Sequence, residues 1–267
     1  MPPNSTQAMQ SLGILNEVRS KATSPHSVAF RSFRDGQILH RSNLCPDMED
    51  RFGTPHLLIH RKEILQILVQ RARRFQDISL RLSSPVIKID LPSQCVLTAK
   101  GDIFKGDVII GADGDRSFCR SKILGRPDPP EPTGRLVYRL TIELNDLRED
   151  SDLRFLVDPP GINCWMGPRA HAVSYELTYN GILNFILVCP DPVEGRIQLG
   201  PQDANKKELK CFLTGWDPVL SKLVDISKNA KYWTILQLAG ESRRWIDNEL
   251  GRMLLIGDAA HAMAPFL

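Results

Sequence analysis

Two short apolar segments, each followed by a glycine and an aspartate, constrain the fold of this chain more than any other feature. Residues 108–110 (Val-Ile-Ile) run into residues 111–114 (Gly-Ala-Asp-Gly), and residues 253–256 (Met-Leu-Leu-Ile) run into residues 257–258 (Gly-Asp). Strands that are apolar throughout are typical of parallel sheets, in which both faces are covered. In open α/β sheets, ligands bind outside the carboxyl ends of such strands. Both turns are therefore candidate ligand sites, and two in one chain are much less expected by chance than one.

The residues at these turns suit a bound phosphate or sugar. Gly111 and Gly114 let a backbone approach a phosphate or a ring closely, because they lack a side chain. Asp113 either accepts from a ligand hydroxyl or fixes its own loop, and the local pattern leaves a ligand site and a tight strand–helix turn equally open. Asp258 is placed to accept hydrogen bonds from sugar or polyol hydroxyls, and the helix start after it presents free N–H groups to a pyrophosphate.

Periodicity before the first of these segments predicts helices and hairpins. A helix capped by Asn4 or Ser5 runs to about Lys21, and a hairpin over 31–40 turns at Asp35-Gly36. An apolar strand over 57–61 leads into a helix over 62–74, and a second hairpin over 85–99 is closed by the turn at 100–102. One face of the helix over 62–74 is predicted to be apolar, with Ile64, Leu65, Leu68, Val69 and Ala72.

A proline-rich break at 127–132 separates this part from a segment with strand-like alternation. Apolar residues alternate over 136–143, 171–179 and 183–188, which predicts antiparallel strands with one apolar face. A helix over 206–216 follows. The chain is thus predicted to be α/β, with one region formed by residues 1–128 and 246–267 and another by residues 129–245.

Composition and charge exclude several classes of partner. The 267 residues, 42% hydrophobic and 24% charged, have the composition of a soluble globular protein. A net charge of +3 with both signs interspersed predicts neither nucleic-acid binding nor membrane binding. No apolar run approaches the about 18 residues of a membrane span, and a cytoplasmic location with free cysteine thiols is expected. His56 and His60 bracket an apolar run with no cysteine or carboxylate to complete a set, so no metal site is expected.

The two turns, taken together, resemble motifs of the flavoprotein monooxygenases of the para-hydroxybenzoate and salicylate hydroxylase group, especially fungal members. Residues 111–117 (Gly-Ala-Asp-Gly-Asp-Arg-Ser) resemble the DG motif, which serves both FAD and NAD(P)H in that family. Residues 257–263 resemble the GD motif, whose aspartate, here Asp258, binds the ribityl chain of FAD. Residues 58–61 (Leu-Ile-His-Arg) resemble the segment whose arginine, here Arg61, contacts FAD.

The resemblance implies an incomplete Rossmann-like FAD-binding region over 1–128 and 246–267 and an antiparallel β-sheet substrate region over 129–245. It further implies that Arg139 meets a substrate phenolate or carboxylate, for which a permanently charged, bidentate guanidinium is suited. Tyr175 is implied to face the same cavity and to hold or polarise a phenol. From the residues alone, a solvent-facing Arg139 and a core Tyr175 are the favoured interpretations.

The implied activity is FAD-dependent hydroxylation of a small aromatic or phenolic substrate with NAD(P)H and O2, in the manner of fungal secondary metabolism. Nothing in the chain matches the GxGxxG turn with which the family opens, and only four residues follow position 263. We therefore expect a chain shortened at both ends. Two alternatives stay open at this point: a remnant without turnover, and a flavin oxidoreductase that inserts no oxygen.

Overall fold

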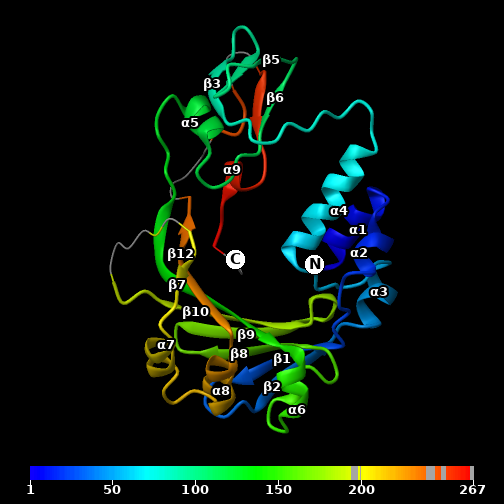
Figure 1. Cartoon of the computed structure of the whole chain (residues 1–267), viewed down its shortest axis with the longest axis vertical. Helices are drawn as coiled ribbons and strands as arrows, with labels where there is room; N and C mark the ends of the chain where they lie inside the picture. Colours follow the sequence, from blue (N-terminus) through cyan, green and yellow to red (C-terminus); the bar gives the residue numbers. More distant parts are fainter. Residues whose placement is uncertain (194–197, 199, 239–243, 248–250, 265–267) are drawn as a thin grey trace. The chain divides into compact units, whose positions relative to one another are not determined.

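The chain forms a mixed α/β structure, as predicted, in two compact units. The computed structural model describes residues 1–193, 198, 200–238, 244–247 and 251–264. The first unit comprises residues 1–79, 136–192 and 198–233, and the second comprises residues 80–135, 193–197 and 234–267 (Figure 1). Within the described residues, no helix is both long enough and apolar enough to cross a bilayer.

An eight-stranded sheet organises the first unit. Its order is β11-β12-β7-β10-β9-β8-β1-β2, and the strands β7 and β12 continue into the second unit. The strands β9 and β10 are antiparallel as predicted, and β8, which was not predicted, pairs antiparallel with β9. Because β1 lies parallel to β8, the sheet is mixed and extends beyond the predicted region. No hairpin turn fixes the direction of β1 against β8, because about 130 residues separate them. The strands are β1 (Ser27–Ser32), β2 (Ile38–Asn43), β7 (Glu131–Glu143), β8 (Ile162–Gly167), β9 (Ala170–Leu177), β10 (Ile182–Pro190), β11 (Gln202–Asp203) and β12 (Asn229–Gln237).

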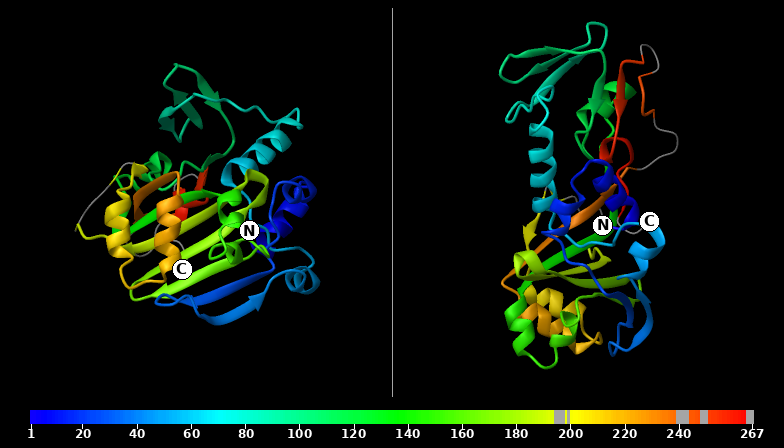
Figure 2. Two further views of the ribbon diagram at one scale, coloured as in Figure 1. Left: turned by 60° about the horizontal axis from the view of Figure 1, so that its bottom comes forward. Right: turned by 90° about the vertical axis from the view of Figure 1, so that its right-hand side faces the viewer.

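Helices cover one face of this sheet and form the main core. Figure 2 shows α7 (Lys206–Phe212) and α8 (Pro218–Ile226) lying across that face. The helix predicted over 206–216 ends earlier in the structure, and α8 was not predicted. The Asp217 carboxylate caps α8 by accepting from the Val219 N–H. The alternating apolar positions of the strands pack against these helices and α6 (Leu144–Glu149). The buried core includes Leu136, Leu140, Trp165, Leu183, Phe185, Leu220 and Leu223.

Three of the four further helices of the first unit correct sequence expectations. The helix predicted up to Lys21 is two helices, α1 (Pro3–Ser11) and α2 (Leu15–Arg19), because Gly13 adopts a left-handed conformation that ends the first. The strand predicted over 57–61 is a single bridge from Leu58 to Thr23, and α4 (Arg61–Arg73) begins there. The buried face of α4 centres on Ile67, whereas Leu65 is 59% exposed, so the predicted apolar face is rotated. The remaining helix is α3 (Asp47–Phe52).

The second unit contains two small sheets. The predicted hairpin of β3 (Val86–Asp90) and β4 (Cys95–Thr98) is confirmed, but the turn at 100–102 leads into a third strand, β5 (Ile103–Lys105). The two apolar segments form a parallel pair, β6 (Ile109–Gly111) and β13 (Met253–Leu255), each followed by a helix, α5 (Phe118–Leu124) and α9 (Asp258–His261). The prediction that these strands are fully buried is wrong within the described residues, since Ile110 is 58% exposed.

Candidate functional site

The two glycine–aspartate turns leave the same edge of one parallel sheet. Leu255 of β13 is paired with Gly111 of β6, and the Ile256 N–H donates to the Gly111 carbonyl at 3.0 Å. The carboxyl ends of the two strands therefore coincide, which is where α/β sheets bind ligands. This arrangement brings three of the predicted cofactor residues, Asp113, Gly114 and Asp258, to one edge of the second unit.

The carboxylate of Asp113 is turned onto its own loop. It accepts from the Ser117 hydroxyl at 2.5 Å and from the Cys119 N–H at 3.0 Å, while the Ser117 oxygen caps α5 by accepting from the Arg120 N–H at 2.8 Å. Burial acts to raise the pKa of Asp113, but the bonds from Ser117 and Cys119 outweigh it, and the pKa is lowered. Asp113 thus fixes the turn after β6, and its contact with a cofactor stays a prediction.

The glycines of the same turn have two different structural causes. Gly114 has φ +83°, a conformation that side-chain-bearing residues rarely adopt, and the space beside it is open. At Gly111, a Cβ would lie 2.6 Å from the Cys119 Cβ and 2.8 Å from the Leu255 Cδ2. Gly111 therefore admits the protein's own α5 and β13, not a ligand as the sequence suggested.

Asp258 has the opposite character from Asp113. It is the exposed first residue of α9, directly after Gly257 with φ +58°, and its side chain makes no hydrogen bond with the described residues. A carboxylate that is exposed and uncommitted at the carboxyl edge of a parallel pair is available to accept from ligand hydroxyls.

A buried arginine that the sequence did not single out joins both turns. Arg120 of α5 is fully buried and donates to the carbonyls of Asp115, after β6, and Ala259, after β13, at 2.6 and 2.9 Å. It also donates to the Asp128 carboxylate at 3.0 Å and the Asp128 carbonyl at 2.8 Å. The only sequence signal was an arginine shortly after a glycine–aspartate turn, which is too common a pattern to mark a buried centre.

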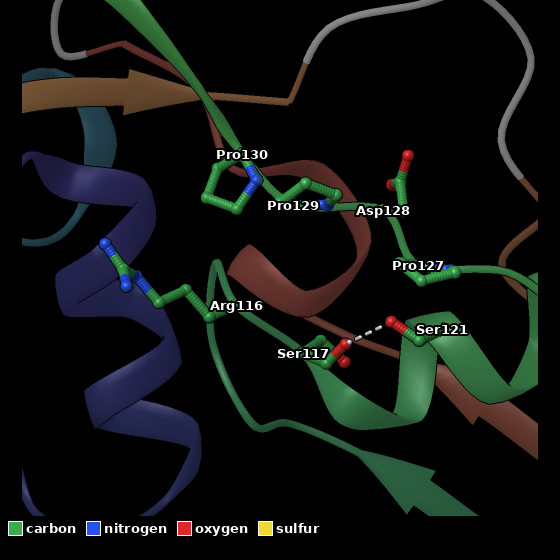
Figure 3. Close-up of a pocket in the computed structure, with 7 residues that line it drawn as sticks. All are labelled: Arg116, Ser117, Ser121, Pro127, Asp128, Pro129 and Pro130. Atoms are coloured by element: carbon green, nitrogen blue, oxygen red, sulfur yellow. Dashed lines mark hydrogen bonds between the residues drawn. The ribbon is translucent and has the colours of Figure 1, made fainter. Parts of the chain in front are cut away.

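A cavity of about 330 Å³ lies beside this network (Figure 3). Figure 3 shows Ser121 bonded to the Ser117 carbonyl, at 3.3 Å, and the Arg116 side chain extending away from both serines. The proline-rich break lies beside the turn after β6 and forms one wall of this cavity. The lining residues are Arg116, Ser117, Ser121, Pro127, Asp128, Pro129 and Pro130.

The two predicted substrate residues meet in the first unit. Arg139 of β7 donates through Nε to the Asn184 Oδ1 of β10 at 2.6 Å, and Tyr175 of β9 lies directly opposite Asn184 and hydrogen-bonds its side chain. Arg139 is half-buried, so it is not a freely solvated arginine. Burial raises the pKa of the Tyr175 phenol, against the opposing effects of the Arg139 charge and the Asn184 bond. Asn184, itself buried, was missed because an asparagine inside an apolar strand gives no functional signal.

His60 joins this cluster from the start of α4. Its Nδ1 accepts from the Lys62 N–H at 3.1 Å and caps the helix, and its Nε2 lies 3.5 Å from an Nη of Arg139. Burial first, and then the Arg139 charge, lower the pKa of His60. Arg61 follows as the exposed first residue of α4. Among the described residues, no three histidine, cysteine or acidic side chains are grouped to hold a metal ion.

Neighbouring strands add apolar side chains to the sheet face that carries the cluster. The strand registers place Ile162 opposite Tyr175, Val28 opposite Ile162 and Cys164 opposite Val173, all on the side facing away from α7 and α8. Most of these side chains are only half-buried. A charged and hydrogen-bonding centre on an apolar surface suits a flat ligand with one polar edge.

Comparison with known proteins bears on both sites. No protein-family model matches the chain. The chain is 32% identical to the FAD-dependent monooxygenase OpS4 of Beauveria bassiana (strain ARSEF 2860), over 100% of this chain and 62% of that protein. It is 28% identical to the 3-hydroxybenzoate 6-hydroxylase of Polaromonas naphthalenivorans (strain CJ2), over 99% of this chain and 63% of that protein. A salicylate hydroxylase–substrate complex shares the fold with a TM-score of 0.81 and 21% identity, over 99% of this chain and 66% of that one.

Along its whole length the chain is similar to FAD-dependent monooxygenases, and its two glycine–aspartate turns lie at one sheet edge. It spans about 62% of the length of the relatives it matches.

Proposed function

We propose that this chain is the part of an FAD-dependent monooxygenase that binds a small aromatic or phenolic acid and much of the flavin, with NAD(P)H and O2 as co-substrates. The observation that carries the proposal is the Arg139–Asn184–Tyr175 cluster on an apolar sheet face. It offers a positive charge, an amide and a phenol at one place, which matches an aromatic ring bearing an acidic oxygen.

The residues present fit FAD. Asp258 supplies an exposed acceptor for ribityl hydroxyls, and Arg61 supplies an exposed cation at the start of α4. We give less weight to Asp113 and Gly114, which would shape the turn after β6 for the flavin. When bound, the flavin supplies electron transfer from NAD(P)H to O2 and delivery of one oxygen atom to the ring. We assign the FAD region to 1–128 and 246–267 and the substrate region to 129–245.

The side chains of the first unit would orient the substrate. Arg139 neutralises the acidic oxygen, and its bond to Asn184 holds the guanidinium in one position, so less freedom is lost on binding. The Tyr175 hydroxyl remains protonated at neutral pH, because burial raises its pKa, and it can donate to a phenolic oxygen. The apolar residues of the face exclude water from the ring.

Titration of the purified chain with FAD tests the proposal. We expect visible flavin absorbance in the bound fraction and saturable quenching of flavin fluorescence, with at least tenfold weaker binding in Asp258→Ala, because a bond to a charged acceptor contributes about 1.5–3 kcal/mol. Asp225→Ala, which removes an exposed carboxylate of α8 held by Lys210, is the control. A preparation that stays colourless with excess FAD would support the remnant without turnover. Product formed without label under isotopically labelled oxygen would support the oxidoreductase without oxygen insertion.

A further inference from the structure

In the first unit, both ring nitrogens of His60 face hydrogen-bond donors, the Lys62 N–H and the Arg139 guanidinium. Arg139 carries only donors, and its Nη lies 3.5 Å from the Nε2 of His60. The other ring nitrogen of His60, Nδ1, already accepts a hydrogen bond from the Lys62 N–H at 3.1 Å. In a neutral imidazole one ring nitrogen has an acceptor lone pair and the other carries an N–H. The ring can therefore accept from one of these two donors, and its own N–H faces the other.

The helix cap decides which nitrogen carries the proton. The Lys62 N–H belongs to the first turn of α4, where an unsatisfied amide is costly, and the backbone cannot turn it elsewhere. Arg139 is held through Nε by Asn184, which leaves its Nη groups free to choose a partner. His60 therefore holds its lone pair on Nδ1 and its proton on Nε2, and the Nε2–H faces the guanidinium.

The neighbouring carboxylate of α4 does not resolve the conflict. Glu63 is held by the Lys21 ammonium at 2.8 Å, and the Asn184 oxygen already accepts from Arg139. Within the described part of the chain, no oxygen accepts from His60 Nε2. Two hydrogen-bond donors that face the same point, one of them permanently charged, can both donate to an anionic oxygen bound there.

We propose that His60 is a substrate-positioning residue whose Nε2–H, with Arg139, binds one anionic oxygen of the aromatic substrate. This inference rests on the proposed function and names the second donor to the acidic group. The geometry selects ligands with a carboxylate or phenolate. An anionic oxygen neutralises the guanidinium charge and accepts from the facing N–H better than a neutral hydroxyl does. Arg139 supplies the positive charge, and the His60 Nε2–H supplies a directed hydrogen bond to the same oxygen.

Salicylate and its neutral analogue salicyl alcohol are the probes, and both are titrated into the full chain by calorimetry. The key variant is His60→Asn, since asparagine keeps an N-cap acceptor for α4 but does not extend to the Arg139 guanidinium. We expect about tenfold weaker salicylate binding, equivalent to about 1.4 kcal/mol, and no change for salicyl alcohol. His40→Asn, at an exposed position on β2, is the matched control and should bind salicylate as the wild type does.

A second readout needs no ligand affinity. Nitrogen NMR of the free protein should show His60 as the Nε2-protonated neutral tautomer, and salicylate should shift the Nε2 proton downfield. A ring protonated on Nδ1 overturns the inference, as does a His60→Asn protein that keeps wild-type salicylate affinity and an intact circular dichroism spectrum. If the wild type binds FAD but no aromatic anion, the inference also fails and the flavoprotein assignment survives; failure to bind FAD is the separate result that counts against the proposed function.

Discussion

Replacing Arg120 by methionine should loosen both glycine–aspartate turns at once. The guanidinium makes four hydrogen bonds, to the carbonyls of Asp115, Ala259 and Asp128 and to the Asp128 carboxylate. Methionine has similar length and suits a buried position, but it has no donor for any of the four. The substitution therefore leaves three carbonyls and a nearly buried carboxylate, 10% exposed, without this partner.

The expected cost is large relative to the stability of a domain. Removing one partner of a buried ion pair costs about 3–5 kcal/mol, because the remaining charge is left without compensation. A whole domain is stable by only about 5–15 kcal/mol. Arg126 provides the matched comparison, since it reaches the same carboxylate at 3.8 Å from a side chain that is 69% exposed. Arg126→Met should cost at most about 1 kcal/mol, as surface ion pairs do.

Native-state hydrogen exchange measures this locally. In Arg120→Met, amides of residues 109–124 and 253–262 should exchange roughly a hundredfold to a few thousandfold faster, which is the stated energy at tenfold per 1.4 kcal/mol. Amides of β9 and β10 in the first unit should be unchanged. If exchange in both turns stays within tenfold of the wild type, or if Arg126→Met matches Arg120→Met, the buried guanidinium is not what joins the turns.

Three further substitutions test the same unit. Gly111→Ala should lower the free energy of unfolding by about 1–3 kcal/mol through overpacking against Cys119 and Leu255, whereas Gly114→Ala, in open space, should cost about 1–2 kcal/mol for its left-handed backbone alone; urea denaturation checks both. Ser117→Ala should raise the pKa of Asp113 and remove a bond contributing about 0.5–1.5 kcal/mol, as carboxyl NMR titration would show. Since the pKa of Asp113 is lowered on folding, its stabilisation is present above the unfolded pKa and lost as pH falls through the folded one. Acidification from pH 6 to below 3.8, the ordinary pKa of an aspartate side chain, should therefore destabilise the wild type more than Ser117→Ala.

The sequence predicted features that depend on local pattern and missed those that depend on distant contacts. The strand–turn motifs, the antiparallel strands β9 and β10 and the hairpin at Asp35-Gly36 follow from short-range periodicity and turn chemistry, and they were confirmed. The parallel contact of β1 with β8 joins segments that no short window contains. The rotated face of α4 has a similar cause, since its apolar residues surround most of the helix and the partners Ile14 and Val18 decide which side is buried.

The polar networks show why composition could not find the centre of either unit. Arg120 and Asn184 are polar residues inside otherwise ordinary elements, and their function comes from what lies opposite them in space. His60 was weighed only as a metal ligand with His56, because spacing along the chain is the one relation a sequence displays. Its real partners are a helix amide two residues away and an arginine 79 residues away.

The remaining mismatch, the half-exposed apolar strand β6, explains why Arg120 carries so much weight. An isolated two-stranded sheet is marginal in water, and a parallel pair usually needs both faces covered. Among the described residues, Val108, Ile110 and Ile256 keep about half of their surface exposed, so burial stabilises the β6–β13 pair less than its sequence suggests. The two turns are therefore held in register by directed bonds more than by hydrophobic burial, and the guanidinium that bonds to both sides is the point at which that register is most sensitive to substitution.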